Sequence, residues 1–329
     1  MTPAPRVLWL ALLAALLVAV TLGLAVGAVP LAPDDVWRAL LGTGDPATLA
    51  IVRDLRLPRI ALGLVVGAGL AASGTALQST LRNPLAEPYL LGVSGGAAVG
   101  AVVAVTLGLS APGLVPLAAF GGAAGAVLLV LLVARAAGGR ADPRLLLMAG
   151  VVVGAFCTSA IMVALATAPA DTVRGALWWM MGSLGDAQWE GVRWVALYVA
   201  LGIALLALWG RDLDVLALGE EAAASLGLDV ERVTRRIYLT ASLLAAATVA
   251  GAGLIGFVGL IVPAIARALG CRGARATVLA SALAGGTLVV LADLAARTAM
   301  APAELPLGAV TALVGVPFFL WRLRAGVRR

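Results

Sequence analysis

The feature that most constrains this chain is a series of long apolar runs separated by short charged segments. The runs cover residues 7–29, 57–80, 88–108, 113–134, 144–168, 191–209, 234–256, 276–298 and 305–323. A helix needs about 20 apolar residues to cross the hydrocarbon core of a bilayer. The chain is 62% hydrophobic and only 12% charged, which leaves too little polar surface for a soluble fold. We therefore expect an all-α membrane protein whose helices face lipid.

The first apolar run follows Arg6 and looks like a signal peptide. It contains 23 residues, from Val7 to Val29. The apolar core of a signal peptide has roughly 7–15 residues. This run is longer, so we expect it to be retained as the first transmembrane helix.

The arginines at the two ends of the chain set the number of spans. Arg6 lies near one end, and Arg322, Arg324, Arg328 and Arg329 lie near the other. Basic flanks stay in the cytoplasm, so both ends should lie there and the number of spans should be even. The missing span is residues 257–270, a short run that Pro263 interrupts; such helices are tolerated where they pack against protein.

The sequence therefore predicts ten transmembrane helices in a single transmembrane domain, residues 1–329, with both termini in the cytoplasm. The tetrapeptide GAGL occurs at 67–70 and again at 251–254, at related places in the two halves. Two five-helix halves of opposite orientation would form an inverted repeat, as in many transporters. A single shared tetrapeptide in a chain rich in alanine and glycine also arises by chance.

The residue types that are missing exclude several kinds of chemistry. The chain has no histidine and no lysine, so it lacks the usual acid–base, Schiff-base and histidine–metal sites. We therefore predict no catalytic residues and no metal site. A Walker A loop requires lysine, so an ATPase that drives this protein must be another chain. The net charge of +6 reflects the topology of the loops rather than nucleic-acid binding.

The longest predicted cytoplasmic segment, residues 211–236, carries the pattern of a compact knob. Gly219 and Gly227 bracket a short helical stretch, and Asp229 can cap a second helix that begins near Val230. An ordinary charged loop is the alternative, but it would not need the paired glycines.

Glycines four residues apart occur in two of the apolar runs. Gly92, Gly96 and Gly100 have this spacing in one run, and Gly63 and Gly67 repeat it in another. Small residues at such positions let the backbones of two helices approach closely. The pattern predicts a tight helix bundle.

Polar residues inside the apolar runs allow two interpretations. Thr75, Gln78 and Ser79 share one helical face, where they would either bond to neighbouring helices or line a translocation path. Asp293 and Arg297 have the i,i+4 spacing of an ion pair. A proton-coupling role for Asp293 would instead suit an ion-coupled secondary transporter, which is the alternative function.

Several separate motifs, in order, resemble one family. They are RLPR (56–59), RNPLAEPYLLGVSGGA (82–97), WWMMGSLGDAQW (178–189), LGEEAAASLGLD (218–229), GFVGLIVP (256–263) and ADLAAR with ELPLGAVTALVGVPFF (292–319). Over nearly its whole length the chain resembles the FecCD-type permeases of binding-protein-dependent ABC importers for iron-siderophores, haem and cobalamin. Within that family it is most similar to the cobalamin permeases.

The resemblance implies a permease in the bacterial inner membrane that dimerises around a central path, with a second copy of itself as the expected partner. Its other partners would be two ATP-binding subunits, a periplasmic substrate-binding protein and membrane lipid. ATP and magnesium would bind to the ATPase chains, and this chain would bind no cofactor. A path without histidine and with scattered methionines favours a chelated metal over a bare ion.

The resemblance also implies residue roles at the cytoplasmic side. The coupling helices would span about 212–232, and the residues that contact the ATPase would be Leu218, Gly219, Glu220, Glu221, Ala222, Leu226 and Gly227. The cytoplasmic gate would comprise Asn83, Leu85, Asp142 and Pro143. Asn83–Pro84 and Asp142–Pro143 each read as a cap residue followed by proline at the first helical position. One departure from the family pattern is Ala264, where histidine is usual.

At the outer side, Arg56, Arg59 and Arg297 break the trend of cytoplasmic arginines. We expect them to be exposed and to form a basic patch that docks the acidic lobes of the binding protein, as similar residues do in the family. Contacts between snorkelling arginines and lipid headgroups are the alternative.

Overall fold

The computed structural model describes residues 5–109, 111, 113–138 and 142–327, and every regular element in them is a helix. The first part contains α1 (Pro5–Ala25), α2 (Pro33–Leu41), α3 (Pro46–Ala50), the π-helical segment η1 (Ile51–Arg56), α4 (Leu57–Thr80), the 3-10 turn η2 (Pro88–Leu91), α5 (Val93–Thr106), α6 (Leu114–Gly138) and α7 (Pro143–Ala166). The second part contains α8 (Ala170–Met180), α9 (Trp189–Leu208), α10 (Gly210–Ala217), α11 (Glu220–Ser225), α12 (Val230–Ala252), α13 (Val258–Ala268), α14 (Ala274–Thr298) and α15 (Leu307–Val327). The all-α prediction is confirmed.

Six helical stretches in the described part of the chain are long and apolar enough to cross a bilayer. They are Arg6–Ala25, Pro46–Thr80, Leu114–Gly138, Pro143–Ala166, Trp189–Leu208 and Ala274–Thr298. Shorter apolar helices lie at Val93–Thr106, Val258–Ala268 and Leu307–Leu320. The chain is thus a multi-pass membrane protein, while the count of ten spans and the inverted repeat stay predictions.

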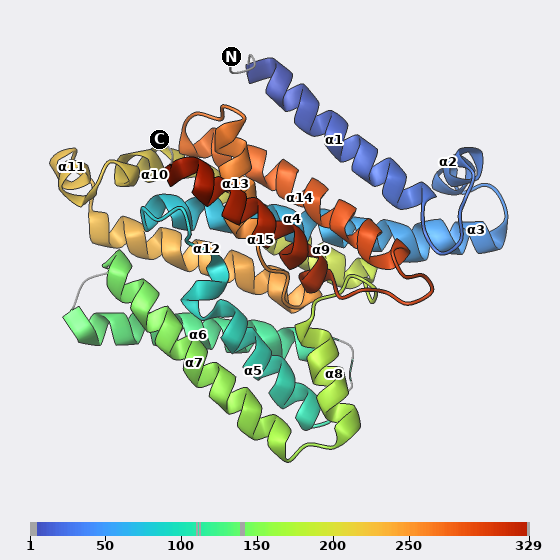
Figure 1. Ribbon diagram of the computed structural model, residues 1–329, viewed down its shortest axis with the longest axis horizontal. Coiled ribbons are helices and arrows are strands. Elements are labelled where there is room, and N and C mark those ends of the chain that lie inside the picture. Colours follow the sequence, from blue (N-terminus) through green and yellow to red (C-terminus); the bar gives the residue numbers. More distant parts are fainter. Residues whose placement is uncertain (1–4, 110, 112, 139–141, 328–329) are drawn as a thin grey trace.

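Helix α4 lies at the centre of the molecule and packs against α9, α12, α13 and α14 (Figure 1). Helices α5 to α8 gather on one side, and α1 runs along the other side against α14. Glycines allow these close approaches, because a Cβ on Gly67 would collide with the backbone of Gly285, and one on Gly74 with the backbone of Gly259.

The glycine pattern of residues 92–100 lies at the contact between α5 and α6, where it allows the tight packing that its spacing predicts. A Cβ on Gly96 would meet the carbonyl oxygen of Gly122, and one on Gly100 that of Ala118. Gly92 has a different role, because with φ of 80° it turns the chain from η2 into α5. The predicted run 88–108 is therefore a 3-10 turn followed by a helix that starts at Val93.

The short helix that an even number of spans required is present as α13, which contains Pro263. Helix α12 ends at Ala252, earlier than the predicted 256, and residues 253–257 form a non-helical break. Gly253 has φ of 70° and Phe257 has φ of 67°, so both ends of the break adopt left-handed backbone conformations. The break joins two helices inside the packed bundle, where unpaired backbone groups would be costly.

Residues 30–56, which lie between the first two predicted spans, are largely helical. Helix α2 is followed by α3 and η1, which continue directly into α4. Helix α3 starts at a capping residue, since the Asp45 carboxylate accepts hydrogen bonds from the amides of Ala47 and Thr48 at 3.1 and 3.2 Å. These elements and the helices α10 and α11 lie at opposite ends of the long axis (Figure 1).

Candidate functional site

The predicted knob is a projection at one end of the molecule, formed by α10 and α11 (Figure 1). Gly219 and Gly227 flank α11 with φ values of 113° and 82°, which only glycine adopts readily. The Asp229 carboxylate caps α12 by accepting from the amide of Arg232 at 3.1 Å. Helix α10 lies largely within the range of about 212–232 that the family resemblance implies for the coupling helices, although the glycine pattern alone did not predict it.

The surface of the knob is apolar at two points. The side chains of Leu218 and Leu226 are 65% and 66% exposed. Both flank α11, beside the exposed carboxylates of Glu220 and Glu221. Both leucines are accessible for contact with a partner protein.

Polar contacts attach α10 firmly to two long helices. The Asp212 carboxylate pairs with Arg236 of α12, whose guanidinium also lies 4.7 Å from the ring centroid of Trp209. The Asp214 carboxylate accepts a hydrogen bond of 2.7 Å from the amide of Ala274, the first residue of α14. Side chains of α10 thus contact both α12 and α14.

The two parts of the predicted gate differ in their local structure. Asp142 caps α7 by accepting from the amide of Arg144 at 2.8 Å, and Pro143 is the first helical residue, as predicted. Asn83 was also expected to start a helix, and this is wrong. Its side chain accepts from the amide of Leu85 at 2.9 Å and closes a turn, after which the chain stays irregular up to η2. Leu85 is 41% exposed.

Glu87 and Tyr89, which sequence reasoning did not select, hold the break between α12 and α13. The Glu87 carboxylate accepts a 2.7 Å hydrogen bond from the amide of Phe257, and the Tyr89 hydroxyl accepts one of 2.8 Å from the amide of Ile255. Both side chains thus replace partners that a continuous helix would have supplied. In the sequence, the only feature that could have indicated this role is a carboxylate directly before Pro88 in an apolar stretch.

Thr75 and Gln78, assigned to the translocation path, are buried inside the chain. The Thr75 hydroxyl donates to the carbonyl of Ala71 in its own helix at 2.9 Å. The Gln78 amide donates to the carbonyls of Gly259 and Leu260 at 3.2 Å, and its oxygen accepts from Arg267. The contacts of Gln78 fit the interpretation of bonding to a neighbouring helix, and Ser79 is half-buried. A place on the translocation path stays a prediction for these residues.

The arginines expected on the outer side are less exposed than the docking prediction requires. Arg56 is only 5% exposed and donates to the carbonyls of Leu24 and Ala25 in the last turn of α1, and to that of Val29 in the loop beyond it. Arg297 is 8% exposed and donates to the carbonyl of Gly23. The expectation of an exposed trio is wrong for these two, since the carbonyls at the end of α1 have no helical donors and take up the guanidinium groups.

Arg59 occupies the centre of an ion-pair cluster. Its guanidinium contacts both oxygens of Asp293 at 2.9 Å, and it reaches Glu304 at 2.8 and 2.9 Å. The hydrogen bond from Arg59 lowers the pKa of the Glu304 carboxyl. Arg297, the expected partner of Asp293, is farther away at 3.7 Å. Asp293 is therefore held mainly by an arginine from α4.

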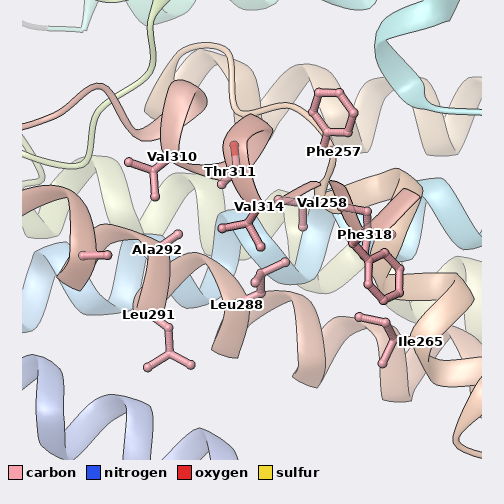
Figure 2. Close-up of a pocket in the computed structure, with 12 residues that line it drawn as sticks. Phe257, Val258, Ile265, Leu288, Leu291, Ala292, Val310, Thr311, Val314 and Phe318 are labelled. Carbon is pink, nitrogen blue, oxygen red and sulfur yellow. The ribbon is translucent and has the colours of Figure 1, made fainter. Parts of the chain in front are cut away.

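An apolar groove of about 250 Å³ lies between α13, α14 and α15 (Figure 2). Phe257, Val258, Leu288, Val314 and Phe318 are among its walls. Thr311 is the one polar residue among its described lining residues, and its hydroxyl donates to the carbonyl of Gly308 at 3.0 Å. Within the described chain, no group of histidine, cysteine or carboxylate residues is arranged to hold a metal ion.

The comparison with known families covers almost the whole of this architecture. A family model described as the FecCD transport family matches residues 15–325. This chain belongs to the FecCD transport family.

Relatives of this FecCD permease carry names from two transport systems. This chain is 37% identical to the Fe(3+)-citrate import system permease YfmE of Bacillus subtilis, over 99% of this chain and 97% of the relative. It is 44% identical to the cobalamin import permease BtuC of Halobacterium salinarum, over 88% and 77%. It is 39% identical to the vitamin B12 import permease BtuC of Citrobacter koseri, over 97% and 94%.

A solved structure of a metal-chelate type ABC transporter in an inward-facing conformation has the same fold. The TM-score is 0.86 at 28% identity, over 96% of this chain and 98% of the other. PsaBC from Streptococcus pneumoniae shares the fold at a TM-score of 0.57 and 18% identity, over 79% and 88%. The FecCD permease is thus a membrane subunit of an ABC transporter and not itself an enzyme.

Proposed function

We propose that this FecCD permease carries a chelated metal, namely cobalamin, an iron-siderophore or haem, from the periplasm into the cytoplasm, driven by ATP hydrolysis on separate subunits. The observation that carries the proposal is the rigidly attached knob with Leu218 and Leu226 exposed. Relatives named for ferric citrate and cobalamin import support the class of substrate.

The assembly that we propose is a homodimer of permeases with two ATP-binding subunits in the inner membrane. ATP and magnesium bind to those subunits, which receive α10, α11 and the residues from Leu218 to Gly227. A periplasmic binding protein docks at the opposite end, where Arg59 is the candidate contact, with a side chain that is 13% exposed. Asn83, Leu85, Asp142 and Pro143 form the cytoplasmic gate.

The alternative of an ion-coupled secondary transporter finds little support in the surroundings of Asp293. A coupling carboxylate has to exchange protons or ions during the cycle. Both oxygens of Asp293 are instead occupied by the guanidinium of Arg59, at 2.9 Å.

The test is transport by the permease reconstituted in liposomes with its ATP-hydrolysing partner and binding protein. Cyanocobalamin, ferric citrate and haem are offered in turn, and we expect uptake of one of them that depends on ATP. A proton or sodium gradient that drives uptake without ATP would contradict the proposal.

A variant of the knob tests its role in the same assay. Replacement of both Gly219 and Gly227 by valine forces β-branched residues into positive φ, which should distort α11 and abolish stimulation of ATP hydrolysis. Membrane insertion should be unchanged. The matched control replaces Gly121 and Gly125 of α6 by valine, since nothing lies within 4 Å of a Cβ at either position. Normal stimulation in the knob variant would rule out this surface as the ATPase contact.

A further inference from the structure

One residue next to the proposed gate reaches the knob directly. Arg82 lies just beyond the end of α4, directly before Asn83. Its guanidinium donates to the Glu220 carboxylate of α11 at 3.0 Å. It also lies over the start of α11, because a Cβ on Gly219 would come within 3.5 Å of its Nη1 atom.

The backbone of Arg82 has a conformation that an arginine rarely adopts. Its φ is 48°, in the left-handed region, where glycine is the residue that helix ends normally use. The amide of Asn83 bonds back to the carbonyl of Gln78 at 3.2 Å, as at a glycine-type helix end. The chain therefore keeps an arginine at a position where glycine would fit without strain.

Stability does not account for the arginine. The side chains of Arg82 and Glu220 are 42% and 51% exposed, and exposed ion pairs add little to folding. A strained residue with a weakly stabilising contact is typical of a functional constraint.

The segment from Arg82 to Glu87 is attached at both ends. Arg82 holds it to α11, and the Glu87 carboxylate holds it to the amide of Phe257 in the break between α12 and α13. Between these two attachments lie Asn83 and the exposed Leu85.

We propose that Arg82 is a positioning residue that transmits movement of the knob to the cytoplasmic gate through its pairing with Glu220. The inference rests on the proposed function, because it assumes that the knob receives the ATPase. When α11 moves, the ion pair displaces Arg82, the first residue of the segment 82–87. The turn that contains Leu85 is then displaced with it.

The experiment measures how accessible the gate is, by labelling a single introduced cysteine in the complex of permease and ATPase. Cys157 and Cys271 are replaced by alanine, Leu85 by cysteine, and the rate of labelling by a soluble maleimide is measured with and without AMP-PNP. We expect the nucleotide to change the rate in the parent. If it does not, the proposed function fails at the gate, whatever Arg82 does.

Two single variants separate coupling from stability. Arg82→Gly should retain or raise the unfolding temperature, because it relieves the left-handed strain. It should nevertheless reduce the nucleotide-dependent change in labelling by at least about fivefold, the lower range for a coupling between sites. Glu220→Gln should reduce the change in the same direction, and Arg82→Gly, which lies outside the proposed ATPase surface, should still co-purify with the ATPase.

A charge exchange provides the rescue, and an arginine elsewhere provides the control. Arg82→Glu combined with Glu220→Arg should restore at least about half of the labelling response, since paired residues are coupled and not additive. Arg135→Gln, in the exposed last turn of α6, should behave like the parent. A parent-like response in Arg82→Gly or in Glu220→Gln would overturn the proposal, as would a failure of the exchange to rescue in complexes that retain the ATPase.

Discussion

At the scale of single residues, Arg56 replaces hydrogen bonds that the end of α1 lacks. The last carbonyls of a helix have no donor within the helix, and here the guanidinium of a buried arginine supplies one for Leu24 and Ala25, and one for Val29 just beyond the helix. The charge serves packing within the chain. This role can be separated from docking by measuring stability.

We expect Arg56→Met to lower the free energy of unfolding by at least about 2 kcal/mol, because buried acceptors lose their donor at about 1–3 kcal/mol each. The matched control is Arg53→Met. Arg53 is exposed and donates to the carbonyl of Leu40 at 2.8 Å, so its loss should cost less than about 1 kcal/mol. Denaturant unfolding in detergent micelles measures both. Equal stability, together with lost binding of the periplasmic protein, would return Arg56 to the docking role that the sequence pattern predicts.

At the scale of elements, the contact between α4 and α14 depends on backbone-to-backbone packing. Gly67 of α4 faces Gly285 and Gly286 of α14, and a Cβ on Gly67 would lie only 2.8 Å from the Cα of Gly286. The neighbours are backbone atoms, which cannot rotate away as a side chain would. The two helices therefore cannot separate to admit a methyl group without disturbing the centre of the bundle.

Gly67→Ala should destabilise the protein by about 1–3 kcal/mol, the usual cost of overpacking. Gly121→Ala in α6 is the control, since open space surrounds that position. It should leave the unfolding temperature unchanged or raise it, because alanine favours a helix over glycine. Thermal unfolding of the two purified variants gives the comparison, and similar temperatures would show that α4 and α14 can move apart freely.

At the scale of the whole molecule, the segment of residues 82–87 bridges two distant parts of the fold. Glu87 connects it to the amide of Phe257, and Phe257 in turn lies against Gly315 of α15, where a Cβ would be 2.7 Å from the Phe257 ring. The C-terminal end of α4 and the broken helix are thus parts of one structural unit.

Glu87→Ala should free the amide of Phe257 and raise its hydrogen-exchange rate on the order of tenfold, which corresponds to about one lost hydrogen bond. Glu87→Gln retains an acceptor oxygen and should keep the protection close to that of the parent. Glu190→Ala, in the exposed first turn of α9, controls for the loss of a carboxylate. Exchange measured on peptides that cover residues 253–260 decides, and equal protection in Glu87→Ala and the parent would show that the carboxylate does not hold the break.

Much of this organisation could be predicted because it depends on local signals. Local signals include the apolar runs, the glycines around α11 and the capping residues Asp142 and Asp229. Each of them affects the backbone only within a few residues along the chain. The partners of Arg56 and Glu87 could not be predicted, since each lies in another element and depends on how the helices pack. The same reason left two interpretations for Gln78, since a polar residue in a span looks the same whether it meets water or a neighbouring backbone.

Arg56 and Arg297, which both donate to carbonyls at the end of α1, are synthesised at very different times. Arg56 follows Leu24 by 32 residues, whereas Arg297 follows Gly23 by 274. At about 5–20 residues per second, the ribosome needs on the order of tens of seconds to deliver the second arginine. During that interval, α1 can contact only one of its two arginine partners. The hydrogen bonds at the end of α1 are therefore completed only after α14 has been made. A chain that stops before α14 leaves the carbonyl of Gly23 without its arginine partner.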